Sequence, residues 1–196
     1  MSLAAIEKRL AALEREKAAQ REQLPPDLVD AKFARQRALL EDESKLICVL
    51  CTRRAAKSFS AAKRLLRALY KHPGASALFV ALTRESAKKI LWKDTLKVLN
   101  RTHKLGAKFN ETELSMTLPN GSVLYLLGVD TTEEEKQKLL GQKYAEVVID
   151  EAASYSIDLF ELVFGILKPA VADYRGTIVL TGTPGNLKKG LFFDLT

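Results

Sequence analysis

Short apolar runs alternate with segments of helical periodicity from Lys45 to Thr181. The runs are LICVLC (46–51), ALFVAL (77–82), EVVID (146–150) and TIVLT (177–181). Helices are predicted after the first three runs, over about 58–71, 84–101 and 156–167. Brief apolar strands that alternate with helices are typical of a parallel sheet buried on both faces. The pattern therefore predicts an α/β fold, with a mainly parallel sheet flanked by helices.

The stretch ELSMTLPNGSVLYLLG (113–128) departs from this alternation. It contains two strand-like runs joined by Pro119-Asn120-Gly121, and residues of these types favour a tight turn. We therefore expect a β-hairpin inserted into the domain.

Residues 1–43 are predicted to form a helical appendage to a main domain over residues 44–196. The first helix, over 3–23, has one apolar stripe, formed by Leu3, Ile6, Leu10 and Leu13. Pro25-Pro26 ends this helix, and a second helix is expected over about 27–41.

Charge is unevenly distributed along the chain, which has a formal net charge of +7. Between Arg53 and Lys108 there are 15 Lys and Arg against two acids, whereas Asp130 to Glu161 holds nine acids against three lysines. A basic middle fits a polyanionic partner, such as nucleic acid or a nucleotide, but also the solvated faces of two helices. No apolar run approaches the roughly 20 residues that span a bilayer, so no membrane association is expected.

The two cysteines, Cys48 and Cys51, lie in one apolar run with CxxC spacing. A structural zinc site needs a second pair of ligands, and His72 and His103 each stand alone in the sequence. We therefore interpret the cysteines as reduced thiols in a buried strand.

The stretch CTRRAAKS (51–58) follows the first apolar run and precedes a predicted helix. The free N–H groups and the dipole at a helix start favour a bound phosphate. Lys57 would place positive charge on the β- and γ-phosphates, and the Ser58 hydroxyl would bind Mg²⁺. The usual pattern, G-x-x-x-x-G-K-[ST], has glycines where this chain has Cys51 and Ala56. Alanine fits at little cost if the backbone there avoids positive φ, so the stretch alone predicts either a nucleotide site or a basic helix start.

A pair of acids, Asp150-Glu151, ends the third apolar run. Adjacent carboxylates beside a buried strand are costly unless positive charge compensates them. In a doubly wound sheet the carboxyl ends of the strands line the ligand crevice, so the pair would face residues 52–57. Asp150 would then hold Mg²⁺ through water, and Glu151 would polarise the water that attacks the γ-phosphate. The alternative is an acidic surface turn.

The fourth run ends in Thr181-Gly182-Thr183-Pro184. Hydroxyls at this position would sense the γ-phosphate or its attacking water and pass the change to a neighbouring loop. A plain turn explains the glycine and the proline equally well.

The order of Lys57-Ser58, Asp150-Glu151 and Thr181 to Pro184, together with the arginine-rich loop TRRAAKS, resembles the ATPase domain of the large terminase subunit of tailed bacteriophages. Members of this family are P-loop ATPases, akin to helicases, that pump double-stranded DNA into a procapsid. The resemblance covers about residues 33–186. It implies a P-loop NTPase fold of the RecA-like type, ATP hydrolysis as the activity, and ATP and Mg²⁺ as cofactors.

The resemblance also implies roles for single residues. Glu151 and Arg53 look catalytic, with Arg53 reaching toward the γ-phosphate, while Ser58 and Asp150 resemble the metal-binding residues. The implied nucleotide-binding residues are Gln36, Arg53, Arg54, Ala55, Ala56, Lys57, Ser58 and Phe59, and the implied coupling residues are Thr181, Gly182 and Thr183. Family members often have Arg-Gly shortly before the acidic pair, for action on a neighbour's ATP, but this chain has Leu140-Gly141. The substitutes considered for that arginine are Lys138, Lys143 and Arg101.

The partners that the resemblance implies are double-stranded DNA, the portal protein and the small terminase subunit. The active form would be a homo-oligomeric ring in the cytoplasm of the infected bacterium, and the isolated domain a monomer with slow turnover. Full-length terminases carry a nuclease domain downstream. The end of this chain, GLFFDLT, follows a loop with no predicted closing element, so we expect a fragment that lacks that domain.

Two rows of basic residues recur every four positions and would each form one helical stripe. The first row is Lys63, Arg67 and Lys71, and the second, the candidate DNA contact, is Lys89, Lys93, Lys97 and Arg101. A motor that ignores sequence should contact phosphates, although solvated helix faces carry the same spacing. Trp92, within the second row, is expected to be a core anchor.

Two other functions remain open from the sequence. One is a helicase-like ATPase that acts on another nucleic acid, and the other is a nucleotide-binding scaffold without turnover. The missing glycines favour the scaffold, whereas Glu151 favours hydrolysis, because a binding module needs no second acid beside Asp150.

Overall fold

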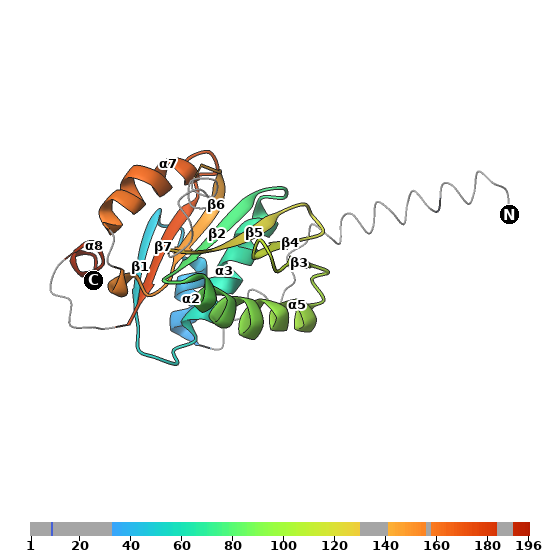
Figure 1. Cartoon of the computed structure of the whole chain (residues 1–196), viewed down its shortest axis with the longest axis horizontal. Helices are drawn as coiled ribbons and strands as arrows, with labels where there is room; N and C mark the ends of the chain where they lie inside the picture. Colours follow the sequence, from blue (N-terminus) through green and yellow to red (C-terminus); the bar gives the residue numbers. More distant parts are fainter. Residues whose placement is uncertain (1–8, 10–32, 130–140, 156–157, 184–189) are drawn as a thin grey trace.

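The computed structural model describes residue 9 and residues 33–129, 141–155, 158–183 and 190–196. A seven-stranded sheet in the order β1-β7-β6-β2-β5-β4-β3 forms its centre (Figure 1). The strands are β1 (Leu46–Leu50), β2 (Ser76–Ala81), β3 (Lys108–Asn110), β4 (Ser115–Thr117), β5 (Val123–Gly128), β6 (Tyr144–Ile149) and β7 (Thr177–Gly182). The predicted helix over 3–23 lies almost entirely outside the described residues.

Five of the strands run parallel, in the order β1-β7-β6-β2-β5. Their carboxyl ends therefore meet at one edge of the sheet: Leu50 of β1 lies opposite Gly182 of β7, and Ile149 of β6 lies between Leu180 and Val80. The predicted mainly parallel sheet is confirmed. Strands β2, β6 and β7 are almost completely buried, as their continuous apolar sequences require.

The predicted hairpin is confirmed as the antiparallel pair β4 and β5, in which Met116 lies opposite Leu124. Strand β3 adds to the outer side of β4 and was not predicted from the sequence. It has three residues, and only Phe109 of them is partly buried, so it leaves no periodic signal.

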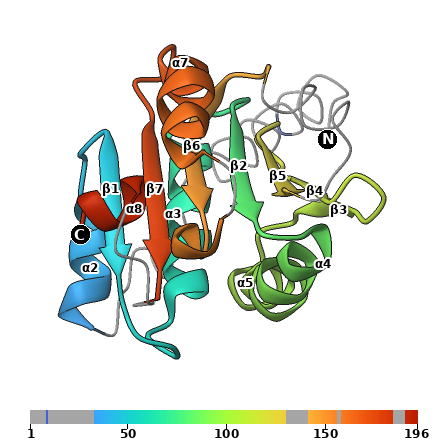
Figure 2. The same ribbon diagram turned by 60° about the vertical axis from the view of Figure 1, so that its left-hand side comes forward.

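Helices cover both faces of the sheet (Figures 1 and 2). One face packs against α3 (Lys57–Lys71) and the continuous helical segment α4 (Arg84–Ala87), η2 (Lys88–Leu96) and α5 (Lys97–His103). The other face packs against η3 (Ala152–Ser154), η4 (Glu161–Leu167) and α8 (Leu191–Asp194), with α7 (Lys168–Val171) continuing η4. Helix α2 (Ala34–Glu41) contacts α3.

Two helical segments differ from the sequence prediction, and a third is tested only over its described part. The helix expected over 84–101 is present, but its middle part, η2, is a π-helix. Residue propensities alone do not reveal the wider turn of a π-helix. The expected second helix, over 27–41, is described only from Ala34 onward. The expectation that no element closes the chain is wrong, because α8 forms there and buries Phe192. No helix in the described part of the chain is long and apolar enough to span a membrane.

Candidate functional site

The loop between β1 and α3 lies at the carboxyl edge of the sheet. The Cys51 amide donates to the Gly182 carbonyl (3.1 Å) and so continues the pairing of β1 with β7 by one residue. Residues 52–55 are then exposed, and α3 begins at Lys57 without a side-chain cap. The first N–H groups of this helix therefore face the loop unpaired by any side chain, as an anion site requires.

Ala56 has the left-handed conformation that glycine usually supplies, with φ 57° and ψ 31°. Arg54 is also left-handed, with φ 63°. The condition under which alanine was expected to fit at little cost, an absence of positive φ, is therefore not met at Ala56. A left-handed L-residue costs roughly 1–2 kcal/mol, which the rest of the fold must offset. The other glycine position of the pattern, Cys51, is not among the positive-φ residues, so a side chain is tolerated there.

Lys57, the first residue of α3, contacts two side chains from different strand ends. Its Nζ donates to Glu151 Oε1 (2.9 Å) and to Thr183 Oγ1 (2.6 Å). Thr183 in turn donates to the same Glu151 oxygen (3.2 Å). The Lys57 side chain is 10% exposed and that of Glu151 is 34% exposed, so the ion pair is only partly screened by water. The sequence-predicted residues Lys57, Glu151 and Thr183 thus form one connected cluster.

Asp150 lies deeper, beside the same cluster. Its residue is 4% exposed, and its Oδ1 accepts a hydrogen bond from the Thr181 hydroxyl at 2.6 Å. Burial raises the pKa of Asp150, and the hydrogen bond from Thr181 lowers it by a smaller amount. Burial remains the largest effect on this pKa although the Thr181 hydroxyl, the Glu151 amide and the Lys57 charge all favour the carboxylate, so added positive charge beside Asp150 is favoured.

The backbone turns sharply between these two acids. The Asp150 amide still pairs with the Val80 carbonyl (2.9 Å), as in β6, whereas Glu151 is left-handed, with φ 51°. A 3₁₀ turn, η3, follows directly, and the Ser154 amide donates to the Glu151 carbonyl (2.8 Å). This turn separates the two carboxylates, so that Asp150 pairs with β7 and Glu151 pairs with α3.

The remaining predicted nucleotide and metal residues do not join the cluster. Ser58 and Gln36 are half-buried. Arg53, Arg54, Ala55 and Phe59 are exposed. Phe59 lies under the Lys63 ammonium, 5.4 Å from the ring centre.

Gly182 has a packing role that the sequence did not indicate. A Cβ atom built at Gly182 would lie 2.6 Å from Cζ of Phe192, a distance that side chains do not tolerate. The glycine therefore lets α8 pack closely on the end of β7.

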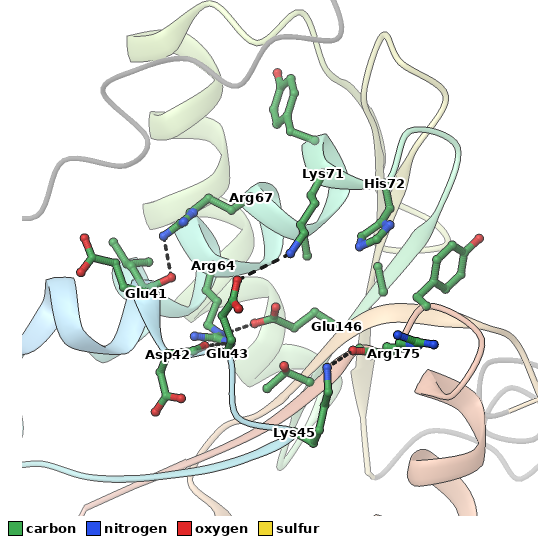
Figure 3. Close-up of a pocket in the computed structure, with 17 residues that line it drawn as sticks. Glu41, Asp42, Glu43, Lys45, Arg64, Arg67, Lys71, His72, Glu146 and Arg175 are labelled. Carbon is green, nitrogen blue, oxygen red and sulfur yellow. Dashed lines mark hydrogen bonds and ion pairs between the residues drawn. The ribbon is translucent and has the colours of Figure 1, made fainter.

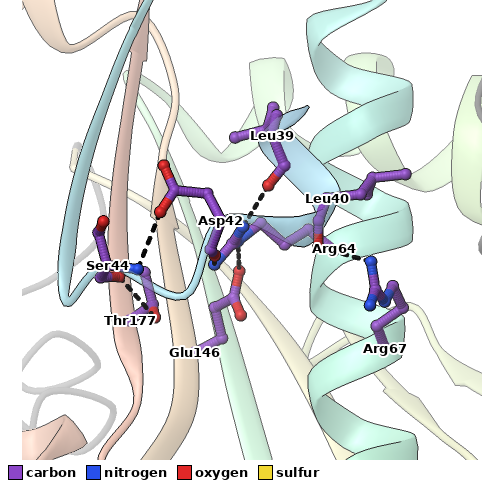
Figure 4. Close-up of polar contacts among 8 residues, drawn as sticks. All are labelled: Leu39, Leu40, Asp42, Ser44, Arg64, Arg67, Glu146 and Thr177. Atoms are coloured by element: carbon purple, nitrogen blue, oxygen red, sulfur yellow. Dashed lines mark hydrogen bonds and ion pairs between the residues drawn. The ribbon is translucent and has the colours of Figure 1, made fainter. Parts of the chain in front are cut away.

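A second charged network, missed by the sequence analysis, lies at the opposite, amino edge of the sheet (Figure 4). Arg64 of α3 donates to the Glu146 carboxylate of β6 and to the carbonyls of Leu39 and Asp42, the last at 2.8 Å. Arg64 is 5% exposed and Glu146 6%. Burial raises the pKa of Glu146 to about 7, although Arg64 acts in the opposite direction.

Arg67 extends this network by donating to the Leu40 carbonyl (2.5 Å). Two guanidinium groups thus bind the last carbonyls of α2, which have no partner within that helix. The first basic row is therefore not an exposed stripe: Lys63 is 9% exposed and Arg67 is part of the network, while Lys71 alone of the three is exposed.

A cavity of about 590 Å³ also lies at the amino edge (Figure 3). Its charged walls are largely paired: Lys45 donates to the Arg175 carbonyl (2.5 Å), and Lys71 lies 3.8 Å from Glu43. The cavity is separated from the Lys57 cluster by the length of the strands. We therefore place the candidate site at the carboxyl edge, because the Lys57 cluster and Asp150 lie there, and not in this cavity.

The second basic row lies on the outer face of η2 and α5. Lys89, Lys93, Lys97 and Arg101 are all exposed. Lys97 is paired with Glu111 (2.9 Å). Trp92 is fully buried and packs edge-on against Phe109, so its predicted place in the core is confirmed.

The other sequence candidates lie away from the cluster. Lys143 precedes β6 at the amino edge and pairs with Asp173, whereas Lys138 and Leu140 lie outside the described residues. Cys48 and Cys51 are free thiols, and burial raises the pKa of both. In the part of the chain that the structure describes, no group of three or more His, Cys, Asp or Glu side chains gathers as a metal cluster would.

Phage DNA-packaging ATPases are among the solved structures with a similar fold. The chain is similar to the ATPase domain of the large terminase of Thermus phage P74-26, with a TM-score of 0.65 and 19% identity over 85% of this chain and 72% of that one. For the large terminase of bacteriophage HK97 the TM-score is 0.59, with 14% identity over 79% of this chain and 33% of that one. For the N-terminal domain of the DNA-packaging ATPase of bacteriophage phi29 the TM-score is 0.59, with 13% identity over 84% of this chain and 87% of that one.

Complexes of the large terminase of a thermophilic bacteriophage with ADP and with ATP-γ-S are also similar, with TM-scores of 0.53 and 0.55. Neither a protein-family model nor a curated protein sequence matches the chain. At these identities the likeness establishes the fold: the chain has the P-loop NTPase fold of terminase ATPase domains, as its sequence motifs predicted.

Proposed function

We propose that this chain is the ATPase domain of a viral DNA-packaging motor, which binds ATP with Mg²⁺ at residues 51–58 and hydrolyses it to drive double-stranded DNA into a procapsid. The observation that carries the proposal is the contact of Lys57, Glu151 and Thr183 at distances of 2.6–3.2 Å. Lys57 begins α3, whereas Glu151 and Thr183 follow the ends of β6 and β7, and the fold is that of phage packaging ATPases.

Lys57 is the residue that changes partner when ATP binds. In the structure its ammonium group neutralises Glu151. The β- and γ-phosphates carry more negative charge than Glu151 and therefore attract the Lys57 ammonium group. The N–H groups at the start of α3 bind the same phosphates. Lys57 then leaves Glu151, whose carboxylate is freed to orient a water molecule and take its proton.

The donor set around Asp150 fits Mg²⁺. The ion prefers oxygen ligands and keeps most of its water, so the Ser58 hydroxyl would bind it directly and the buried Asp150 carboxylate would hold it through water. When bound, the ion neutralises charge on the phosphates. Thr181 holds the Asp150 carboxylate in place through their 2.6 Å hydrogen bond.

Thr183 links the site to the segment that follows β7. Its hydroxyl contacts both Lys57 and Glu151, so it loses or changes a partner whenever that ion pair opens. Arg53, exposed on the loop, would add positive charge to the γ-phosphate. Gln36 would read the adenine base. A neighbouring copy in a ring would supply the remaining positive charge in trans, so the isolated domain should turn over slowly.

In the same proposal, the motor works in the cytoplasm of the infected bacterium with the portal protein and the small terminase subunit. Lys89, Lys93, Lys97 and Arg101 would contact DNA phosphates.

The test measures steady-state ATP hydrolysis with Mg²⁺ and equilibrium ATP binding for the chain and for two variants, Glu151→Ala and Lys57→Ala. We expect Glu151→Ala to bind ATP without turnover and Lys57→Ala to lose binding. Exposed residues of the same types, Glu161 and Lys108, provide matched alanine controls that should behave as wild type. Binding without any turnover, even at high protein concentration or with DNA and partner proteins, would favour a nucleotide-binding scaffold. No binding of ATP at all would refute the proposal.

A further inference from the structure

Glu111 bridges two lysines of the continuous helical segment formed by α4, η2 and α5. One of its carboxylate oxygens lies 3.2 Å from Lys88 Nζ and the other lies 2.9 Å from Lys97 Nζ. The three side chains are between 37% and 54% exposed, so solvent and other molecules can reach them. The hydrogen bonds from Lys97 and Lys88 lower the pKa of Glu111 to about 2, so its carboxylate is ionised at neutral pH. An anionic group thus lies between two cations on an accessible surface.

The π-helical part of this segment, η2, brings the two lysines to one side of the helix. Lys88 is the first residue of η2, and Lys97 follows its last residue, nine positions later. In an α-helix, with about 3.6 residues per turn, nine positions make two and a half turns, which would place the two side chains on opposite sides. The i→i+5 hydrogen bonds of a π-helix widen each turn, so nine positions make close to two full turns. The rare π-helix therefore creates this pair of lysines, and π-helical turns are frequent at functional sites.

The turn between β3 and β4 holds Glu111 beside this helical segment (Figure 2). Asn110 Oδ1 accepts hydrogen bonds from the amides of Thr112 (3.0 Å) and Glu113 (3.1 Å). Arg84, the first residue of α4, donates to the Thr112 carbonyl. The turn is therefore tied both to its own strand and to the helical segment that carries the lysines.

Lys97 is also placed by two aromatic rings. Its Nζ lies 6.0 Å from the ring centres of both Trp92 and Phe109. Trp92 is fully buried, and the two rings pack edge-on with their centres 5.0 Å apart, so the core fixes their position. An ammonium group beside such rings is attracted to them. The rings therefore favour the same place for Lys97 when the carboxylate leaves.

We propose that Lys88 and Lys97 form a binding site for a backbone phosphate of duplex DNA, and that Glu111 occupies this site until DNA displaces it. This inference rests on the proposed function, which places DNA on the second basic row, where Lys97 lies. A phosphodiester has the same single negative charge as the carboxylate and accepts hydrogen bonds from the same ammonium groups. An exposed ion pair contributes little stability, whereas each phosphate that the protein neutralises releases counterions from DNA. DNA can therefore displace Glu111, and the presence of Glu111 weakens DNA binding.

The test is a fluorescence anisotropy titration of a labelled DNA duplex with the full chain at low salt. Glu111→Gln should bind the duplex about two- to fivefold more tightly than wild type, the gain that release of an exposed ion pair allows. Glu113→Gln is the matched control, because it removes the same charge from the same turn, and Glu113 makes no ion pair with either lysine. Its gain should be clearly smaller.

A second pair of variants tests whether the two lysines form the site. Lys88→Ala/Lys97→Ala should bind the duplex more weakly than wild type, because the site loses both of its cations. Adding Glu111→Gln to this double variant should then increase affinity no more than Glu113→Gln does in the wild-type chain.

Two results would overturn the inference while leaving ATP hydrolysis, and so the ATPase part of the proposed function, untouched. If Glu111→Gln and Glu113→Gln tighten binding equally, Glu111 acts only through net charge. If the larger gain persists without Lys88 and Lys97, these lysines are not the site. If neither wild type nor Glu111→Gln binds the duplex, both this inference and the DNA contact of the proposed function fail.

Discussion

Replacing Ala56 by glycine should stabilise this protein, although it removes a side chain. Ala56 is the cap of α3 and has φ 57°, a conformation that the Cβ atom disfavours. Glycine adopts it without steric cost. The substitution also restores the glycine that phosphate-binding loops usually carry before their lysine.

The expected gain follows from two opposing effects. Relief of the left-handed strain contributes roughly 1–2 kcal/mol. The greater freedom of glycine in the unfolded chain takes back about 0.4–1 kcal/mol. The difference is a net gain of about 1 kcal/mol. With a urea m-value of about 2 kcal/mol/M, the unfolding midpoint should rise by about 0.5 M.

The assay is equilibrium urea unfolding followed by far-UV circular dichroism. The matched control is Ala55→Gly, at a neighbouring exposed position that is not among the positive-φ residues. The control has only the unfolded-state effect and should lose about 0.5 kcal/mol. If Ala56→Gly loses as much stability as Ala55→Gly, the loop is not left-handed at Ala56, and the reasoning from backbone strain is wrong.

Three further outcomes test other parts of the molecule. Because burial raises the pKa of Glu146 from 4.5 to about 7, the folded protein binds this proton more tightly than the unfolded chain does. The free energy of unfolding should therefore fall as pH rises from 4.5 to 7, and Glu146→Gln should flatten that slope; an unchanged slope in urea melts at several pH values would contradict the assignment. Arg64→Ala should cost about 3 kcal/mol in the same melts, because it leaves Glu146 buried without its partner, and a loss below about 1 kcal/mol would show that the pair is dispensable. The double variant Lys89→Ala/Lys93→Ala should weaken duplex DNA binding equally for different sequences. The slope of log K against log salt should fall by about 0.9 for each phosphate that the variant no longer neutralises. Binding titrations with an unchanged slope would exclude this face as a DNA contact.

The sheet and the candidate site could be predicted because their signals are local. Each core strand is a continuous apolar run, and Lys57, Asp150 and Thr181 each follow or end such a run. Parallel strands bring their carboxyl ends together, so the order of the motifs was enough to place these residues at one edge. Which side chains pair there, Lys57 with Glu151 and Thr181 with Asp150, is tertiary information that the order does not contain.

The amino-edge network could not be predicted for the same reason. Arg64 and Glu146 are 82 residues apart, and each occurs in a stretch whose periodicity is that of an ordinary helix or strand. Arg64 sits in a basic helix, where a charge is usually taken to face water. Glu146 sits in a strand that was identified by its valines and isoleucine. The left-handed φ of Ala56 was hidden as well, because alanine carries no sequence signal for that conformation.

Strand β6 joins these two edges and limits how they can communicate. From Glu146 to Asp150 the distance along an extended strand is about 13 Å, at about 3.3 Å per residue. The strand is paired on both sides and buried on both faces, so it cannot slide by one residue without turning every side chain to the wrong face. The strand therefore stays fixed in the sheet and does not slide along its own axis. Helix α3 contacts the strand at both edges, since its first residue holds Glu151 and its Arg64 holds Glu146, so a rigid-body movement of α3 would act on both ends of the domain at once.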